Sequence, residues 1–490
     1  MEVPMSLPIW TPRDYQREMR DFGIDVPRCQ VWCSPGGGKT STGLTIFDHL
    51  RWFGEANHLL VVSTKRIAQY VWSNEIARWD NFKDLSIAVA VGSPEQRLAA
   101  VKKRALVTTI NFENLPWLVE TMGDAWYWDM VIADESTKLK SLRIDMRTSS
   151  TGKVFARQSG GSSRAMAIAR VAHKKVRRWI CLTGTPAPNG LIDLWAQAWF
   201  CDAGQRLGRS FTAYKERWFR QIRVGDDAFQ FRLEPYAHSD AEIKEALRDI
   251  TIMIDAKQYM DLPPVVTNVV KVPLPSKARK LYEDMEKEYF IELISARGVE
   301  EIEAFNAGSK SMKCRQLASG AIYLKPDDGS DTAPWEAVHD SKIEAISDIA
   351  EELNGAPLLI AYQFRSDLAR LQKAFPKGRY FDDNPRTLQA FRDGKIPQLF
   401  IHPASGGHGI DGMQDVCNNI AFFSQTWNLE EFEQVVERIG AVRQVSAGHF
   451  RSVYIHLIVA EDTVEEEMVH RIQTKASVQD SLKLAMKRRM

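Results

Sequence analysis

The chain has 490 residues, 44% of them hydrophobic and 26% charged, with 64 Lys and Arg against 63 Asp and Glu. This length allows two to four domains, and this composition excludes collagen-like, low-complexity and wholly disordered proteins. A net charge of +1 excludes a histone-like polycation but leaves room for a local basic groove.

Cysteine usage and hydropathy indicate the compartment. Six cysteines in 490 residues cannot form a disulfide framework, and the absence of a CxxC pair disfavours a zinc site. No apolar stretch reaches the ~18 residues that span a bilayer, and the N-terminus lacks the pattern of a signal peptide. We therefore expect a soluble protein of the cytoplasm, where thiols stay reduced.

The first 200 residues alternate short β-branched runs with helical patterns such as Ile67 to Trp79. This alternation predicts βαβ units around a parallel sheet. The expected strands are Cys29 to Cys33, Leu59 to Ser63, Ala105 to Thr109, Met130 to Ala133 and Trp179 to Leu182.

A second region of the same character begins near residue 340. Its expected strands are Pro357 to Ala361, Gln398 to Ile401, Ile420 to Phe423 and Val453 to Val459. Between the two regions the chain is charged, helical in pattern at Ser276 to Ser295, and broken by prolines. We therefore predict an α/β protein with a first lobe over 1–200, a helical insertion and linker over 201–335, a second lobe over 336–475 and a basic tail over 476–490. Thr148 to Arg164 and Pro326 to Ala333 are expected to be loops.

The strongest chemical signal is CSPGGGKT at residues 33–40, between an expected strand and an expected helix. This context predicts a phosphate-binding loop. Gly36, Gly37 and Gly38 would let backbone N–H groups face phosphate oxygens, assisted by the helix N-terminus. Lys39 would neutralise the β- and γ-phosphates, and the Thr40 hydroxyl would ligate Mg²⁺.

A second signal is MVIADES at residues 130–136, where an apolar strand ends in two carboxylates. Ligands bind at this edge of a parallel sheet. Asp134 would hold Mg²⁺ through water, and Glu135 would orient and deprotonate the attacking water. By itself the pair is also compatible with an ordinary acidic helix start.

A third signal, CLTGTPAPN at residues 181–189, offers hydroxyls and amides at a strand end but no general base. With DESTKLKS, ASGGHGID and QVVERIGAVRQ it completes an ordered series that resembles the motifs of superfamily-two helicases, specifically the Swi/Snf-type DNA-dependent ATPases. The resemblance extends through nearly the whole chain. It implies two RecA-like lobes that bind ATP between them, and compact motors of this kind are typical of bacteria and their viruses.

The resemblance also assigns nucleotide-site roles. Gln16 in TPRDYQREM matches the adenine-reading glutamine, and Asp411 matches the residue that faces the ribose. Gln434 and Arg438 match the start of the last motif. The position of the family's second arginine holds Ala441, with Arg443 two residues later, so the arginine finger is either Arg438 or Arg443.

DNA contacts implied by the resemblance should go mainly to phosphates, because a motor must tolerate every sequence. The matching positions are Thr64, Lys65, Thr108, Thr109, Lys138, Lys140, Thr185 and Ser405. For the two lysines after the catalytic carboxylates, a solvated charged surface is the alternative. Trp72, Trp79 and Trp195 are expected in cores rather than stacked on bases.

The sequence thus predicts an ATP- and Mg²⁺-dependent DNA helicase or translocase. Three alternatives stay open: an RNA-dependent helicase of the same superfamily, a small-molecule kinase with a phosphate loop, and a nucleic-acid-binding scaffold with a decayed motor. A kinase would need no second parallel-sheet lobe, and a scaffold would not hydrolyse ATP.

Overall fold

The computed structural model describes residues 7–148, 154–187, 190–223, 231–295, 312–324, 334–382, 384–406 and 412–474. The chain forms two compact units, and the boundary between them along the sequence lies between Asp261 and Leu262. Each unit is built on a parallel sheet, so the predicted α/β fold with two RecA-like parallel-sheet lobes is confirmed.

The first unit contains a seven-stranded sheet in the order β11-β1-β8-β5-β2-β4-β3, with every pair parallel. Its strands are β1 (Arg28–Cys33), β2 (Leu59–Ser63), β3 (Ile87–Ala90), β4 (Val107–Asn111), β5 (Met130–Asp134), β8 (Arg178–Thr183) and β11 (Thr251–Ile254). Most of these strands are buried along their length, because helices cover a parallel sheet on both faces.

In the first unit, α1 precedes the first strand, and the other helices lie between the strands in the chain. They are α1 (Asp14–Asp25), α2 (Lys39–Trp52), α3 (Trp72–Arg78), α4 (Pro94–Lys102), α5 (Leu115–Met122), α6 (Ser163–Ala172), α7 (Leu194–Asp202), α8 (Phe211–Trp218) and α9 (Ser239–Leu247). Trp72 and Trp195 are fully buried, as predicted, and Trp79 is half-buried.

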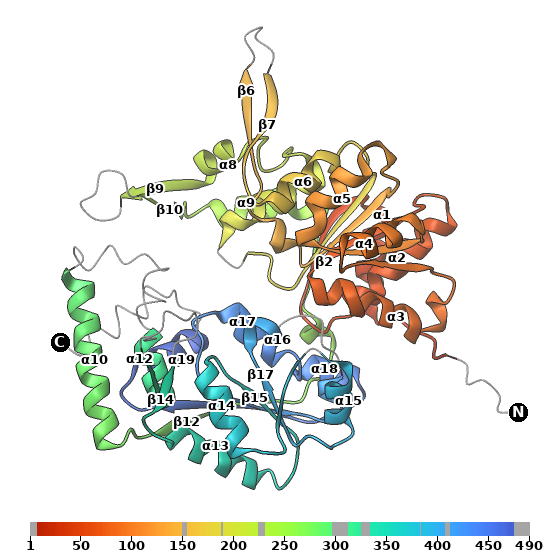
Figure 1. Cartoon of the computed structure of the whole chain (residues 1–490). Coiled ribbons are helices and arrows are strands. Elements are labelled where there is room, and N and C mark those ends of the chain that lie inside the picture. Colours follow the sequence, from red (N-terminus) through yellow and green to blue (C-terminus); the bar gives the residue numbers. More distant parts are fainter. Residues whose placement is uncertain are drawn as a thin grey trace, which may run out of the picture. The chain divides into compact units, whose positions relative to one another are not determined.

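Two antiparallel ribbons extend from the first unit (Figure 1). One pairs β6 (Arg143–Thr148) with β7 (Val154–Gly160), and the other pairs β9 (Phe219–Arg223) with β10 (Phe231–Pro235). The prediction of a loop over Thr148 to Arg164 is therefore wrong for its described part, because β7 pairs with β6 and α6 begins at Ser163.

The second unit contains a six-stranded parallel sheet in the order β12-β19-β18-β15-β17-β16. Its strands are β12 (Val265–Val272), β15 (Leu358–Ala361), β16 (Arg379–Tyr380), β17 (Gln398–Ile401), β18 (Asn419–Phe422) and β19 (Val453–Ala460). A small ribbon joins β13 (Ala321–Tyr323) to β14 (Trp335–Ala337). The helices are α10 (Ser276–Ser295), α12 (Met312–Ser319), α13 (Ser341–Glu352), α14 (Arg365–Ala374), α15 (Pro385–Arg392), α16 (Pro403–Gly406), α17 (Leu429–Val436), α18 (Ala441–Ser446) and α19 (Val464–Thr474).

The unit boundary differs from the predicted lobe boundaries. The region 201–335, expected as a separate insertion and linker, contributes strands to both sheets: β11 pairs with β1, and β12 pairs with β19 along eight residues. The sequence did not reveal this because both are sheet-edge strands, and β12 is largely exposed and lacks an apolar run. The predicted loop over 326–333 and the predicted tail over 476–490 both lie wholly outside the described residues.

All six cysteines are buried as free thiols. Among the described residues, no helix is both long and apolar enough to cross a membrane.

Candidate active site

The loop between β1 and α2 has the backbone that its glycines predicted. Gly36 and Gly38 have φ angles of +78° and +79°, in the left-handed region that glycine adopts without strain. Gly38 is also the N-cap of α2. A loop of this shape at a helix N-terminus is the arrangement in which backbone amides bind phosphate.

Gln16 on α1 is buried and bonds directly to this loop. Its Nε2 donates to the carbonyl oxygen of Gly37 at 3.1 Å, and its Oε1 accepts from the Arg13 amide at 2.9 Å. A Cβ atom added at Gly38 would overlap Gln16 Nε2, so the absence of a side chain at residue 38 makes this contact possible. The structure thus joins Gln16 to the phosphate loop, and its role toward adenine stays a prediction.

We expect Gly38→Ala to impair ATP turnover severely and to lower the free energy of unfolding by about 1–3 kcal/mol, because it combines a left-handed φ with a steric overlap. Gly54→Ala is the matched control: Gly54 also has a left-handed φ, of +71°, but a Cβ there meets nothing within 4 Å. Denaturant unfolding and phosphate release check both variants. Equal ATPase loss in the two variants would contradict the steric explanation.

Lys39 and Thr40 lie in the first turn of α2 and are both half-buried. Lys39 Nζ donates to the carbonyl oxygens of Cys33 at 2.8 Å and Ser34 at 3.3 Å. Its ammonium group is therefore held over the loop, where phosphate oxygens can replace these acceptors.

Asp134 is the last residue of β5 and only 5% exposed. Burial, together with the neighbouring charge of Glu135, raises the pKa of Asp134 to about 6, while the Lys39 ammonium favours the carboxylate. Trp72 Nε1 donates to Asp134 Oδ2 at 3.1 Å. A cation beside this carboxylate would offset the cost of its buried charge.

Glu135 has a left-handed backbone, with φ +64° and ψ +54°. A non-glycine residue in this region carries about 1–2 kcal/mol of strain, which persists where the surrounding structure holds it. The strain sits directly after the buried carboxylate, at the residue predicted to act as the base. The backbone thus supports a functional role for Glu135.

The turn after β8 joins the same site through a residue that the sequence did not single out. Gln197 on α7 accepts from Ser136 Oγ at 2.8 Å and donates to the Pro186 carbonyl at 2.7 Å. It therefore links the segment after the carboxylates to the Thr-Gly-Thr-Pro turn. A Cβ at Gly184 would meet Pro35 Cδ at 3.1 Å, so this turn packs closely on the phosphate loop. The one available signal was a lone glutamine within the apolar run LWAQAWF.

The end of β11 and the residues after it also hold the phosphate loop. The Ser34 amide donates to the Ile254 carbonyl at 3.3 Å, and the Ala256 amide donates to Ser34 Oγ at 3.1 Å. The ring of Tyr259 lies 5.5 Å from that of Tyr15 on α1. These contacts join residues that are 220 or more positions apart in the chain, so the sequence could not reveal them.

Two of the predicted DNA contacts are wrong. Thr108 and Thr109 lie inside β4 with fully buried side chains, and Thr109 Oγ1 donates to the Ala68 carbonyl at 2.5 Å. The strand continues to Asn111, two residues beyond its predicted end, so these threonines belong to the sheet rather than to a loop.

The other predicted DNA-contacting residues of the first unit are more accessible. Lys65 is exposed, and it lines a cavity of about 430 Å³ together with Gln69 and Gln96. Thr64 and Thr185 are half-buried. Lys138 is half-buried, whereas Lys140 forms an ion pair of 3.2 Å with the buried Asp193.

The predicted residues of the last motif lie in the second unit. Gln434 on α17 donates to Glu430 Oε1 at 3.0 Å. Arg438 follows α17 and is 8% exposed, and Arg443 lies half-buried on α18. The choice of arginine finger stays a prediction. Ser405 lies in the short helix α16, and Asp411 falls outside the described residues.

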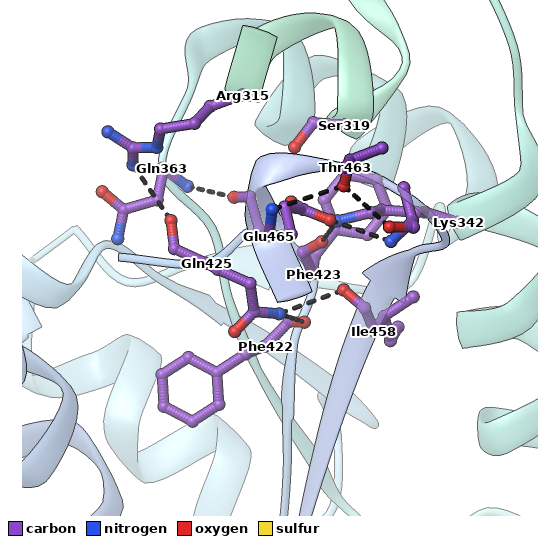
Figure 2. Close-up of polar contacts among 12 residues, drawn as sticks. Arg315, Ser319, Lys342, Gln363, Phe422, Phe423, Gln425, Ile458, Thr463 and Glu465 are labelled. Atoms are coloured by element: carbon purple, nitrogen blue, oxygen red, sulfur yellow. Dashed lines mark hydrogen bonds and ion pairs between the residues drawn. The ribbon is translucent and has the colours of Figure 1, made fainter. Parts of the chain in front are cut away.

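A buried polar network supports the motif strands of the second unit (Figure 2). Lys342 Nζ donates to Glu465 Oε1 at 2.6 Å and to the Phe423 carbonyl at 2.9 Å, and both side chains of the ion pair are at most 1% exposed. Gln425 Nε2 donates to the Ile458 carbonyl at 3.0 Å, and Arg315 donates to the Gln425 carbonyl at 2.9 Å. The ends of β18 and β19 are thereby fixed to α12, α13 and α19.

No family model matches the chain. It is 44% identical over 482 residues to a protein called p41 from Acyrthosiphon pisum secondary endosymbiont phage 1, covering 98% of this chain and 99% of p41. It is 21% identical over 467 residues to YwqA of Bacillus subtilis, a candidate ATP-dependent helicase/translocase, covering 91% of this chain and 45% of YwqA. It is also 21% identical over 478 residues to snf21 of Schizosaccharomyces pombe, a subunit of a chromatin structure-remodeling complex, covering 90% of this chain and 36% of snf21.

The chain thus matches p41 over nearly its full length and spans less than half of YwqA and of snf21. Among solved structures, the helicase domain of Hef from Pyrococcus furiosus superposes with a TM-score of 0.54 at 13% identity, covering 95% of this chain and 98% of that domain. This likeness concerns the fold. With its ordered motifs, its two parallel-sheet lobes and these relatives, the chain belongs to the SWI2/SNF2-type family of superfamily-two helicases.

Proposed function

We propose that this protein is an ATP-dependent DNA translocase or helicase. One observation carries the proposal: β1, β8 and β5 are neighbours in the sheet, and the three motifs that follow them bond to or pack against one another. The residues predicted to bind phosphate and to activate water, together with the Thr-Gly-Thr-Pro turn, therefore lie at the same carboxyl-terminal edge of the sheet.

The donors at this edge fit ATP with Mg²⁺. The glycine loop leaves room for phosphate oxygens, Lys39 supplies a cation, and Thr40 with Asp134 supplies the hard oxygen donors that Mg²⁺ prefers. The metal ion would supply charge neutralisation at the phosphates. Glu135 would hold the attacking water and accept its proton, while Gln197 would carry changes at Ser136 to the Thr-Gly-Thr-Pro turn.

The second parallel-sheet unit disfavours the small-molecule kinase, which has no use for it. The intact Lys39, Thr40, Asp134 and Glu135 disfavour a decayed motor. The Swi/Snf-type motifs favour DNA over RNA. We place the action of the protein in the cytoplasm of a bacterium or phage-infected host, and the similarity to a phage protein supports this proposal.

The decisive experiment is ATP turnover with single-stranded DNA, duplex DNA, forked DNA and RNA, measured side by side. We expect DNA to stimulate ATP turnover at least about tenfold above the rate without nucleic acid, since the binding energy of the DNA is used to complete the catalytic site. Stimulation by RNA alone would favour the RNA-dependent alternative. The absence of ATP hydrolysis under every condition would refute the proposed function and leave the nucleic-acid-binding scaffold as the remaining alternative.

A further inference from the structure

The β6–β7 ribbon has no part in the ATP site, yet it begins a few residues after it. β6 starts at Arg143, after the 3-10 turn η5 (Ser136–Leu139) that follows the catalytic carboxylates. The ribbon extends away from the body of the first unit (Figure 1). Its two strands pair in the register Arg143↔Gly160 to Thr148↔Val154.

The ribbon and its flanks are strongly basic in a chain that is almost neutral overall. Residues 136–164 contain seven Lys and Arg but one acidic residue, Asp145. Arg143 and Asp145 are two residues apart on β6 and therefore share a face, on which Arg157 of β7 stands opposite Asp145. Arg147 follows two residues later on β6, where its backbone pairs with Phe155. The side chain of Arg157 is exposed.

The second ribbon shows that this charge is particular to β6–β7. Residues 219–235 contain three arginines and three acidic residues, so the β9–β10 ribbon is neutral. Arg220 on β9 pairs with Glu234 on β10 at 3.0 Å.

The base of the β6–β7 ribbon is fixed to the segment after the carboxylates. Arg143 donates to the carbonyls of Lys140 and Leu142 at 2.8 and 2.7 Å, and its guanidinium lies 3.8 Å from the ring centre of Phe211 on α8. After β7, the hydroxyl of Ser162 accepts a hydrogen bond from that of Ser141 at 2.8 Å, and Arg164 donates to the Lys138 carbonyl at 3.0 Å. A displacement of the ribbon would thus be transmitted to the segment that directly follows Glu135.

We propose that the β6–β7 ribbon is an arm that binds the phosphate backbone of duplex DNA and couples its presence to the ATP site. The proposal rests on the proposed function. A six-residue strand is about 20 Å long, enough to cross a B-DNA major groove, which is about 12 Å wide and admits a two-stranded ribbon. The deep, narrow major groove of duplex RNA does not admit one, so the geometry favours DNA.

The test removes two charges from the ribbon of the full chain. Arg147→Gln/Arg157→Gln should weaken binding of a duplex DNA about 10- to 100-fold near 0.1 M salt and reduce the slope of log affinity against log salt by about 2. DNA stimulation of ATP turnover should fall in parallel. The matched control, Arg217→Gln/Arg220→Gln, removes two arginines that are paired with Glu242 and Glu234 in the same unit, and should keep both properties.

The outcomes separate this inference from the proposed function. Wild-type protein that is not stimulated by any DNA would refute the proposed function. The proposal that the ribbon is a DNA-binding arm would be refuted in two cases, both with DNA stimulating ATP turnover normally in the wild type. In the first, the ribbon variant keeps the wild-type slope of log affinity against log salt. In the second, the control variant loses as much DNA affinity as the ribbon variant. An equal loss of duplex RNA binding would also overturn it, since the ribbon would then be a general polyanion contact. Thermal unfolding of each variant verifies that the fold is intact.

Discussion

Lys39→Ala is expected to reduce the rate of ATP hydrolysis by at least about 10²–10³-fold, since it removes the ammonium group that neutralises charge developing at the phosphates. The side chain donates its described hydrogen bonds to the carbonyls of Cys33 and Ser34 rather than to a carboxylate. Its loss removes a favourable charge near the buried Asp134, which keeps its hydrogen bond from Trp72. The fold should therefore persist. Phosphate release at saturating ATP measures the effect.

Glu135→Gln should have a different signature. It keeps the size and hydrogen-bonding capacity of the side chain but removes the base, so hydrolysis should fall about 10²–10⁴-fold while ATP affinity stays within a few-fold of wild type. Single-turnover hydrolysis and binding of a fluorescent ATP analogue separate the two effects. Lys83→Ala, at an exposed lysine paired with Asp80, is the control and should behave as wild type. Hydrolysis that survives both active-site substitutions would refute the assignment of the site.

The second large effect concerns the stability of the second unit. Lys342→Met should destabilise it by about 3–5 kcal/mol, because Glu465 would remain as a buried charge without its cation. Burial lowers the pKa of Lys342, and the ion pair with Glu465 opposes that shift. Replacing both residues, as Lys342→Met/Glu465→Gln, should recover a large part of the loss, since no unpaired charge remains.

Hydrogen exchange of the backbone amides of β18 and β19 is the suitable measurement, because it reports opening of this unit separately from the first. Lys244→Met provides the control: Lys244 pairs with Asp240 on the exposed surface of α9 at 2.7 Å, and such pairs contribute about 1 kcal/mol or less. A double variant as unstable as Lys342→Met alone would show that packing, rather than the unpaired charge, causes the loss.

The sequence by itself determined the local parts of the ATP site. The glycines of the phosphate loop, the strand before it and the helix after it occupy consecutive residues, so their conformation follows from short-range sterics and hydrogen bonding. The same holds for Asp134 and Glu135 at the end of a buried strand. The strands with the strongest apolar runs were found within two residues of their observed ends.

Only the tertiary structure decided which distant segments of the chain contact one another around the candidate active site. The pairing of β11 with β1, the support of Ser34 by Ala256, and the link from Ser136 through Gln197 to Pro186 depend on contacts across 11 to more than 220 residues of chain. Thr108 and Thr109 were misassigned for a related reason: whether a threonine lies in a strand interior or at its end depends on the register of the neighbouring strand. Edge strands and the segments around buried polar residues have only a weak hydrophobic periodicity in their sequences. Their positions therefore depend on the strands and side chains that they contact, which the local sequence does not reveal.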